Sequence, residues 1–349
     1  MTRDTRVHGC SLWRDGIRVN GGLIRFAGTA AWAAAAAFAG ACLAAGPAWK
    51  PEQNVEMVVG TGPGAGGDVT ARLVQRIFQE KRLVEVPSFV VNKVGGGGVL
   101  ALAYIVQNAG SGRHLLFSSP TLLTNQIMGK TASTYTDLTP LAQIGTEYVA
   151  FSVAVDSPLK TGRDLVARFK QDSGGLAFAL ANSLGNHNHI AIAQFATAMG
   201  VDVKKLKVVV FNSSADVVTA LLGGHVDVVA SPGSAVYPHV QAGKVRILAV
   251  AAERRLSGAL SFVPTWSEQG VRVVSSNWRN VSGPKGMTEA QVQYWDGVFG
   301  RLVQQDEWKR DVEARQFENT YLNSADTRRL MDAQHAELTA ILRAVGLAK

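Results

Sequence analysis

The sequence predicts an α/β fold in two domains, each a mostly parallel sheet flanked by helices. Two observations lead to this prediction. Short apolar runs of strand length alternate with amphipathic segments of helical length after about Trp49, which is typical of β-α units and parallel sheets. The chain also has 349 residues, more than one hydrophobic core usually holds. Ligands of such open sheets bind beyond the carboxyl ends of the strands, so a site is expected in the loops there.

Each expected strand or helix is indicated by the local pattern of apolar residues in the sequence. The run VEMVVG is short and apolar, as a buried strand is, whereas Val69, Leu73 and Ile77 recur on one face of a helix. Strands are expected at 55–60, 88–94, 114–119, 141–155, 176–181, 206–211, 226–231 and 245–252. Helices are expected at 67–83, 97–110, 159–171, 189–200, 214–224, 236–244, 288–315 and 324–346.

The first 48 residues have the composition of an export signal. Five arginines precede the alanine-rich apolar run of residues 26–45, and small residues follow it up to Ala48. A basic start, an apolar centre and a small-residue cleavage zone are typical of a secretory signal peptide. The run is long enough to span a membrane, so an uncleaved anchor is the alternative, but its weakly apolar alanines favour cleavage.

Both cysteines, Cys10 and Cys42, fall in this segment. The mature chain would therefore contain no disulfide, thiolate nucleophile or cysteine metal site. Cys42 follows AGA, which weakly resembles a lipoprotein cleavage box without its usual leucine. Lipid attachment at Cys42 is the less favoured alternative.

The charge of the chain argues against nucleic acid as a partner. The first 48 residues hold five arginines and two aspartates, so they supply +3 of the formal net charge of +8 and leave +5 on residues 49–349. The basic residues of that part are scattered and are not interleaved with aromatic residues, as a nucleic-acid-binding stripe requires. A mild positive balance instead fits anionic small ligands or an ordinary solvated surface.

The loop GTGPGAGGD, residues 60–68, ends the first strand and opens a helix. Its glycines match the dinucleotide pattern G-x-G-x-x-G, but Asn92 and Lys93 stand where that fold needs an acid. A phosphate loop fails as well, because Asp68 stands where a lysine belongs. Either the glycines only permit a tight turn and Asp68 caps the helix, or the free N–H groups of the helix start also bind a carboxylate.

The loop ANSLGNHNH, residues 181–189, follows another strand. It differs from the nucleophile elbow G-x-S-x-G by Ala181, so Ser183 is the candidate nucleophile of a hydrolase. Its two flanking histidines suggest a metal pair, but a third ligand is not near in the sequence. More simply, Asn186 or Asn188 caps the helix, and the polar donors of this loop suit a ligand carboxylate.

The loop FNSSAD, residues 211–216, is a third helix start, with Ser214 as the expected cap and Asp216 in the first turn. Three strand ends thus offer small polar residues and free N–H groups, and none offers a convincing acid–base pair. This pattern describes a binding protein better than an enzyme. No cofactor and no metal ion are expected.

Six sequence blocks between about Trp49 and Lys349 occur in an order that matches a known family. They are GPGAGGDVTAR, NSLGNHNHIAIAQFATAMGV, FNSSADVVTALLGGHVDVV, VQAGKVRILAVAAERR, VPTWSEQG and NWRNVSGPKGMT. These blocks resemble the substrate-binding proteins of tripartite tricarboxylate transporters, the TctC or Bug family. FNSS and NWRNVSGPKG resemble its tricarboxylate-binding branch more than the larger branch, which carries a Tyr-Lys-Gly turn at residues 211–213.

The resemblance implies a periplasmic clamshell of two domains, the Venus-flytrap fold, that is not an enzyme. One domain would hold residues 49–145 and 252–349 and the other residues 146–251, with hinge crossings near 145–153 and 246–251. A citrate-like ligand or a dicarboxylate would lie between the domains. Closure would then present a surface to the membrane permease subunits of the transporter. The receptor is expected to be a monomer.

The resemblance also implies that backbone amides, helix N-termini and water hold the carboxylate. Carried over position by position, the ligand-binding residues are Gly64, Ala65, Gly66, Gly67, Asp68, Ser118, Ser119, Asn182, Ser183, Asn186, His187, Phe211, Asn212, Ser213 and Arg279. Arg279 is the cation expected to make a bidentate contact with a polycarboxylate, and an ordinary ion pair is its alternative. The alternatives for the whole protein are a secreted hydrolase that uses Ser183 and a ligand-sensing partner of a sensor kinase.

Overall fold

The computed structural model describes residues 49–349. The predicted export signal and both cysteines lie outside the described residues. Within the described range, no helix is both long enough and apolar enough to cross a membrane.

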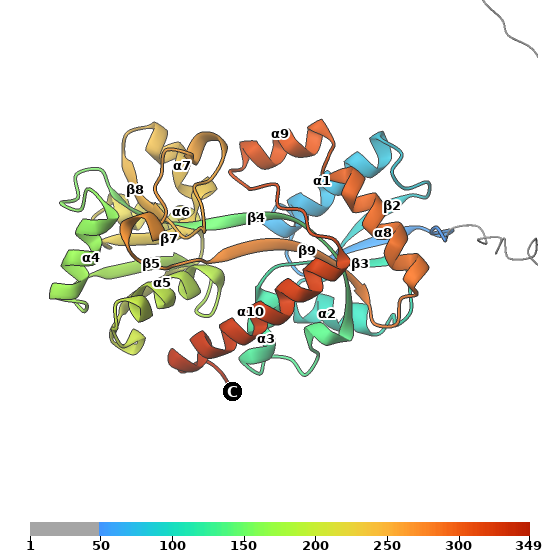
Figure 1. Cartoon of the computed structure of the whole chain (residues 1–349), viewed down its shortest axis with the longest axis horizontal. Helices are drawn as coiled ribbons and strands as arrows, with labels where there is room; N and C mark the ends of the chain where they lie inside the picture. The colour runs from blue at the N-terminus through green and yellow to red at the C-terminus, as the bar shows by residue number, and fades with distance from the viewer. Residues whose placement is uncertain (1–48) are drawn as a thin grey trace, which may run out of the picture. The chain divides into compact units, whose positions relative to one another are not determined.

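The described strands form one mixed sheet in which β4 and β9 connect two groups of shorter strands (Figure 1). The spatial order is β2-β1-β3-β9-β4-β7-β5-β6, and β8 pairs with β4. We call the group of β1, β2 and β3 the first half and the group of β5, β6, β7 and β8 the second half. The strands are β1 (Val55–Val59), β2 (Ser88–Asn92), β3 (His114–Ser118), β4 (Leu138–Ala154), β5 (Ala177–Ala181), β6 (Lys207–Phe211), β7 (Val228–Pro232), β8 (Val245–Val250) and β9 (Ser276–Pro284).

Strand β4 joins the halves because its partners change along its length. Its residues from Leu138 to Tyr148 pair antiparallel with β9, whereas those from Val149 to Ala154 pair antiparallel with β7 and β8. Within the first half β1 pairs parallel with β2 and β3, and within the second half β5 pairs parallel with β6 and β7, whereas β8 pairs antiparallel with β4. The predicted α/β fold with parallel sheets is therefore confirmed, with an antiparallel connection added to it.

Helices cover both faces of each half (Figure 1). In the first half, α1, α8 and α9 pack on one face of the sheet, and α2, α3 and α10 pack on the other. In the second half, α4 and α5 pack on one face, and α6 and α7 pack on the other. The helices are α1 (Gly66–Glu80), α2 (Val99–Val106), α3 (Thr121–Ile127), α4 (Gly162–Gln171), α5 (His187–Ala198), α6 (Ser214–Leu222), α7 (Gly233–Gln241), α8 (Glu289–Leu302), α9 (Asp306–Ala314) and α10 (Ser324–Ala344).

The C-terminal helix α10 contacts both halves. Its residues Met331, Leu338 and Leu342 lie in the first-half core beside α3. Ile341 and the C-cap residue Val345 pack against that core and also against the second-half core beside α5. The helix therefore holds the halves together alongside β4 and β9.

Two elements were not predicted, α3 and β9, because neither has a run of apolar residues that stands out. The segment predicted as the second crossing, 246–251, is β8, which stays within the second half. Ala252, Leu260 and Val273 still pack in second-half cores, and β9 is the strand that returns to the first half. The division into domains stays a prediction, and this packing favours a second boundary near Ser276.

Candidate functional site

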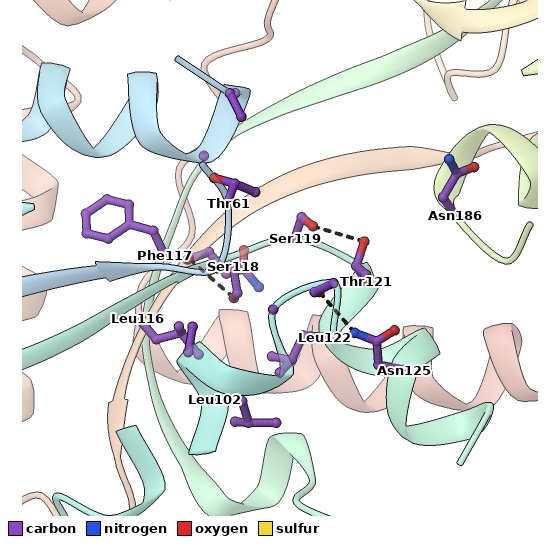
Figure 2. A pocket seen from close by; sticks show the side chains of 18 of the residues that line it. Thr61, Leu102, Leu116, Phe117, Ser118, Ser119, Thr121, Leu122, Asn125 and Asn186 are labelled. Atoms are coloured by element: carbon purple, nitrogen blue, oxygen red, sulfur yellow. Dashed lines mark hydrogen bonds between the residues drawn. The ribbon is translucent and has the colours of Figure 1, made fainter. Parts of the chain in front are cut away.

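A cavity of about 440 Å³ lies where the strand ends of the two halves face each other. The first half contributes the residues that follow β1, β2 and β3, and the second half contributes the loop between β5 and α5. Strand β9 contributes Asn277, Arg279 and Asn280. Figure 2 shows Ser118, Ser119 and the other labelled first-half residues on one side and Asn186 across from them.

The first glycine loop lines the cavity at the start of α1. Ala65 occupies the N-cap position, and its side chain offers no hydrogen bond to the helix. The N–H groups of Gly66 and Gly67 find no acceptor among the described residues. Free N–H groups and the positive end of the helix dipole form a site for an anion. A side chain at Gly66 would place its Cβ 3.4 Å from Nη2 of Arg279, so the guanidinium lies beside this helix start.

Asp68 does not cap α1 as predicted, because it lies inside the first turn. Its carboxylate is buried and accepts hydrogen bonds from the Gly64 N–H at 2.8 Å and from the side chains of Arg72 and Asn92. Burial would raise the pKa of Asp68, but these hydrogen bonds outweigh it and lower the pKa to about 2. Asp68 therefore stabilises the loop from within and, like Gly64, does not line the cavity.

A second glycine loop, Gly95–Gly98, precedes α2, lines the cavity through Gly97 and Gly98, and was not predicted. All four glycines have positive φ angles, which other residues adopt only with strain. A Cβ on Gly60 would lie only 2.5 Å from the Cα of Gly98, so the loop packs directly on the end of β1. Asn125 of α3 donates a hydrogen bond to the Gly97 carbonyl at 3.0 Å. The sequence pattern that could have predicted this part of the site is a glycine run between a strand and a helix, as in the first loop.

The first-half wall combines hydroxyl groups with apolar side chains. Ser118 ends β3 and Ser119 follows it, and the Ser119 hydroxyl donates to the hydroxyl of Thr121 at 3.4 Å. Apolar side chains line the cavity on the same half: Leu102, Leu116, Phe117 and Leu122 (Figure 2). A ligand in this cavity can therefore bury an apolar body against one wall while its polar groups contact the helix starts.

The second-half wall is the loop between β5 and α5. Asn182 has a φ of 74°, a left-handed conformation that asparagine tolerates better than most residues. Asn186 caps α5 as predicted, because its side chain accepts a hydrogen bond from the His189 N–H at 3.0 Å. The N–H groups of His187 and Asn188, the first two residues of α5, find no acceptor among the described residues. α5 therefore presents a free helix start to the cavity from the side opposite α1.

The histidines of this loop are neutral at physiological pH. Burial lowers the pKa of His187 to about 3, with a contribution from the positive charge of Arg279, and burial lowers the pKa of His189 to about 4. The His189 imidazole accepts a hydrogen bond from the Gly185 N–H. Neither ring is hydrogen-bonded to the hydroxyl of Ser183 in the described part of the chain, so the geometry gives the hydrolase alternative no support. Residues 49–349 contain no group of three candidate ligands that could hold a metal ion.

Arg279 is the single ionised side chain among the described residues that line the cavity. It lies on β9 with only 12% of its side chain exposed, 3.4 Å from the Glu147 carboxylate of β4. Burial lowers the pKa of Arg279, whereas Glu147 opposes this effect. Its Nη1 donates to the backbone carbonyls of Asn277 and Trp278, its guanidinium lies over the Phe317 ring, and its buried Nε has no partner in the described structure.

The third predicted loop does not reach the cavity. Strand β6 is an edge strand of the second half, and β5 and β7 separate it from β4, so its end lies further away. Ser213, and not Ser214, caps α6, and its hydroxyl accepts from the N–H of Asp216 at 3.2 Å. The carbonyl of Phe211 accepts from the Asn182 N–H at 2.8 Å. The third loop therefore stabilises the adjacent loop between β5 and α5, which does line the cavity.

The cavity thus brings most of the predicted residues together. Those that line it are Ala65, Gly66, Gly67, Ser118, Ser119, Asn182, Ser183, Asn186, His187 and Arg279. Those that do not line it are Gly64, Asp68, Phe211, Asn212 and Ser213.

Comparison with known proteins agrees with the resemblance seen in the sequence. The model of the tripartite tricarboxylate transporter family receptor matches residues 70–347. Protein BugT of Bordetella pertussis is 30% identical over 68% of this chain and 72% of its own length. The protein of the gbd 5' region of Cupriavidus necator is 27% identical over 90% of this chain and 96% of its own length.

Solved structures share the fold. A TctC solute-binding protein from Polaromonas, without ligand, has a TM-score of 0.75 at 24% identity and covers 84% of this chain and 99% of its own. Rpa4515 of R. palustris, solved with adipate, has a TM-score of 0.71 at 24% identity and covers 85% of this chain and 99% of its own. MatC of Rhodopseudomonas palustris, with bound malate, has a TM-score of 0.67 at 20% identity and covers 84% of this chain and 99% of its own. The predicted two-domain solute-binding fold is confirmed.

Proposed function

Because the chain belongs to the tripartite tricarboxylate transporter family of receptors, we propose that its cavity captures an organic di- or tricarboxylate. One observation carries this proposal. Three helix starts, those of α1, α2 and α5, meet at a single cavity, and Arg279 is the one ionised side chain that lines it within residues 49–349. Such a cavity attracts a small anion and offers it several N–H donors.

The contacts available in the cavity suggest how the ligand is held. One carboxylate accepts hydrogen bonds from the first-turn amides of α1 and from Arg279, and another from the start of α5 and the serine and asparagine side chains around it. The apolar wall buries the carbon chain between them. The adipate in Rpa4515 and the malate in MatC support a ligand of this class, since both are dicarboxylates.

Binding is coupled to closure of the two halves. A ligand that contacts α1 in the first half and α5 in the second stabilises the closed arrangement by its higher affinity for it. The long strands β4 and β9 serve as the hinge. We place the receptor in the periplasm as a monomer, where the closed form delivers the ligand to the permease subunits of a tripartite transporter.

A thermal-shift series tests the proposal. The receptor is heated with adipate, glutarate, malate and citrate, each at concentrations well above its dissociation constant, and with adipamide as a neutral control. At least one acid is expected to raise the melting temperature, because a ligand that binds only the folded state stabilises it. The absence of a shift with every organic acid, or an equal shift with adipamide, contradicts the proposal.

A further inference from the structure

Glu147 is a buried carboxylate immediately behind the cavity, in contact with two of the side chains that line it. It lies on β4, only 5% of it is exposed, and it does not itself line the cavity. Its two oxygens accept hydrogen bonds from three donors: Ser234 of α7 at 2.8 Å, Asn277 of β9 at 3.2 Å and Arg279 at 3.4 Å. Two of these donors, Asn277 and Arg279, line the cavity.

The ion pair with Glu147 cancels the formal charge of the site. Arg279 supplies one positive charge, Glu147 supplies one negative charge at 3.4 Å, and His187 is neutral. Asp68 in the first turn of α1 is likewise paired, with Arg72 at 2.9 Å. Arg315, whose positive charge acts on Arg279, is paired with Asp311 at 2.8 Å. What remains to attract an anion is the partial charge of three helix starts, each equivalent to about half an elementary charge.

We propose that Glu147 limits the charge that the cavity accepts, so that the receptor prefers dicarboxylates to tricarboxylates. This inference rests on the proposed function of the same cavity. The partial charges of the helix starts match one or two carboxylates. A third carboxylate lies near Glu147 or in the apolar part of the cavity, where it loses its hydration without gaining a cation.

Ligand pairs that differ by a single carboxylate test this inference. Glutarate becomes propane-1,2,3-tricarboxylate by addition of one carboxylate, and adipate becomes butane-1,2,4-tricarboxylate in the same way. Titration calorimetry at pH 7.5 and constant ionic strength gives the ratio of the two dissociation constants for each pair. We expect that, in at least one pair, the wild type binds the dicarboxylate about tenfold more tightly than the corresponding tricarboxylate.

Substitutions at Glu147 identify the cause of the preference. Glu147→Gln keeps the shape and removes the charge, and we expect it to reduce the preference by about tenfold. Glu147→Asp keeps the charge and is expected to keep the preference, and Glu268→Gln, at a position that does not line the cavity, is the control. The double substitution Glu147→Gln with Arg279→Gln restores a neutral pair and the wild-type preference, at lower affinity.

The outcomes separate this inference from the function on which it rests. Circular dichroism and thermal unfolding show whether each variant is folded before it is titrated. If dicarboxylates bind but Glu147→Gln keeps the wild-type preference, Glu147 does not limit the ligand charge. If tricarboxylates bind the wild type as tightly as dicarboxylates, the inference is wrong and the proposed function stands. If no organic acid binds the wild type, the proposed function itself fails.

Discussion

At the scale of single residues, the site depends on a buried arginine and on neutral polar groups. Arg279 keeps its positive charge although burial lowers its pKa, because a guanidinium in a protein does not lose its proton. Its Nε and both polar atoms of the Asn280 side chain are buried without a partner among the described residues. Unpartnered buried donors are costly, so a ligand or a bound water that satisfies them gains affinity.

The first prediction concerns Arg279. Arg279→Gln removes the cation and leaves the buried Glu147 carboxylate without its cationic partner. We therefore expect the dissociation constant of the best dicarboxylate to rise by about tenfold to a hundredfold. Titration calorimetry measures this change. Arg255→Gln, at an exposed ion pair with Glu268, is the control and should leave the affinity unchanged. Unchanged affinity in Arg279→Gln would exclude a direct role in binding.

The second prediction concerns the buried histidines. The pKa of His189 is about 4 in the folded state, below the value of about 6.5 in an unfolded chain, so the unfolded state binds more protons between these values. Its contribution to stability is present above pH 6.5 and is lost as the pH falls toward 4. His189→Gln should therefore reduce the pH dependence of the unfolding free energy by about 1.4 kcal/mol per pH unit in this window.

Urea unfolding between pH 7 and pH 4.5 measures that slope. His225→Gln changes a histidine at an exposed position and is the matched control. An identical slope in wild type and His189→Gln would show that the burial of this ring does not lower its pKa.

At the scale of elements, the cavity is built by helices that begin where strands end. The glycine loops before α1 and α2 let two backbones approach closely, and Gly60 is the tightest of these contacts. The sequence predicted the first of these loops, because its glycines follow a clear strand. It did not predict the role of Gly95–Gly98. It also did not predict strand β9, because NWRNVSGP mixes polar and apolar residues and its pairing with β3 and β4 is not visible in the local pattern.

The third prediction tests that close contact. Gly60→Ala would place a Cβ 2.5 Å from the backbone of Gly98, so the start of α2 must shift. We expect a loss of about 1–3 kcal/mol in unfolding free energy and weaker ligand binding. Gly62→Ala is the matched control, because nothing lies within 4 Å of its Cβ position. Equal behaviour of the two variants in urea unfolding and calorimetry would contradict this account of the loop.

At the scale of the whole described chain, β4, β9 and α10 connect the halves. The sequence predicted the two groups of parallel strands and the long first crossing, because these appear as apolar runs. It placed the second crossing at 246–251, since β8 has the same apolar signature as a crossing strand and only its partners distinguish it. The third loop was expected at the ligand for a similar reason: the sequence does not reveal that β6 is an edge strand.

The fourth prediction concerns α10. Ile341 packs against the cores of both halves, so Ile341→Ser should lower the unfolding free energy by about 1–2 kcal/mol and also weaken ligand binding, although it does not line the cavity. Ala340→Ser, at the neighbouring exposed position, is the control. Normal affinity in a folded but destabilised Ile341→Ser variant would show that α10 does not couple the halves.

The most direct test of the account is a crystal structure of the receptor with the organic acid that stabilises it most. We predict the ligand inside the cavity, with one carboxylate within hydrogen-bond distance of the Gly66 or Gly67 N–H and of Arg279, and with the other facing the start of α5. A ligand bound elsewhere, or one that contacts neither helix start nor Arg279, would contradict it.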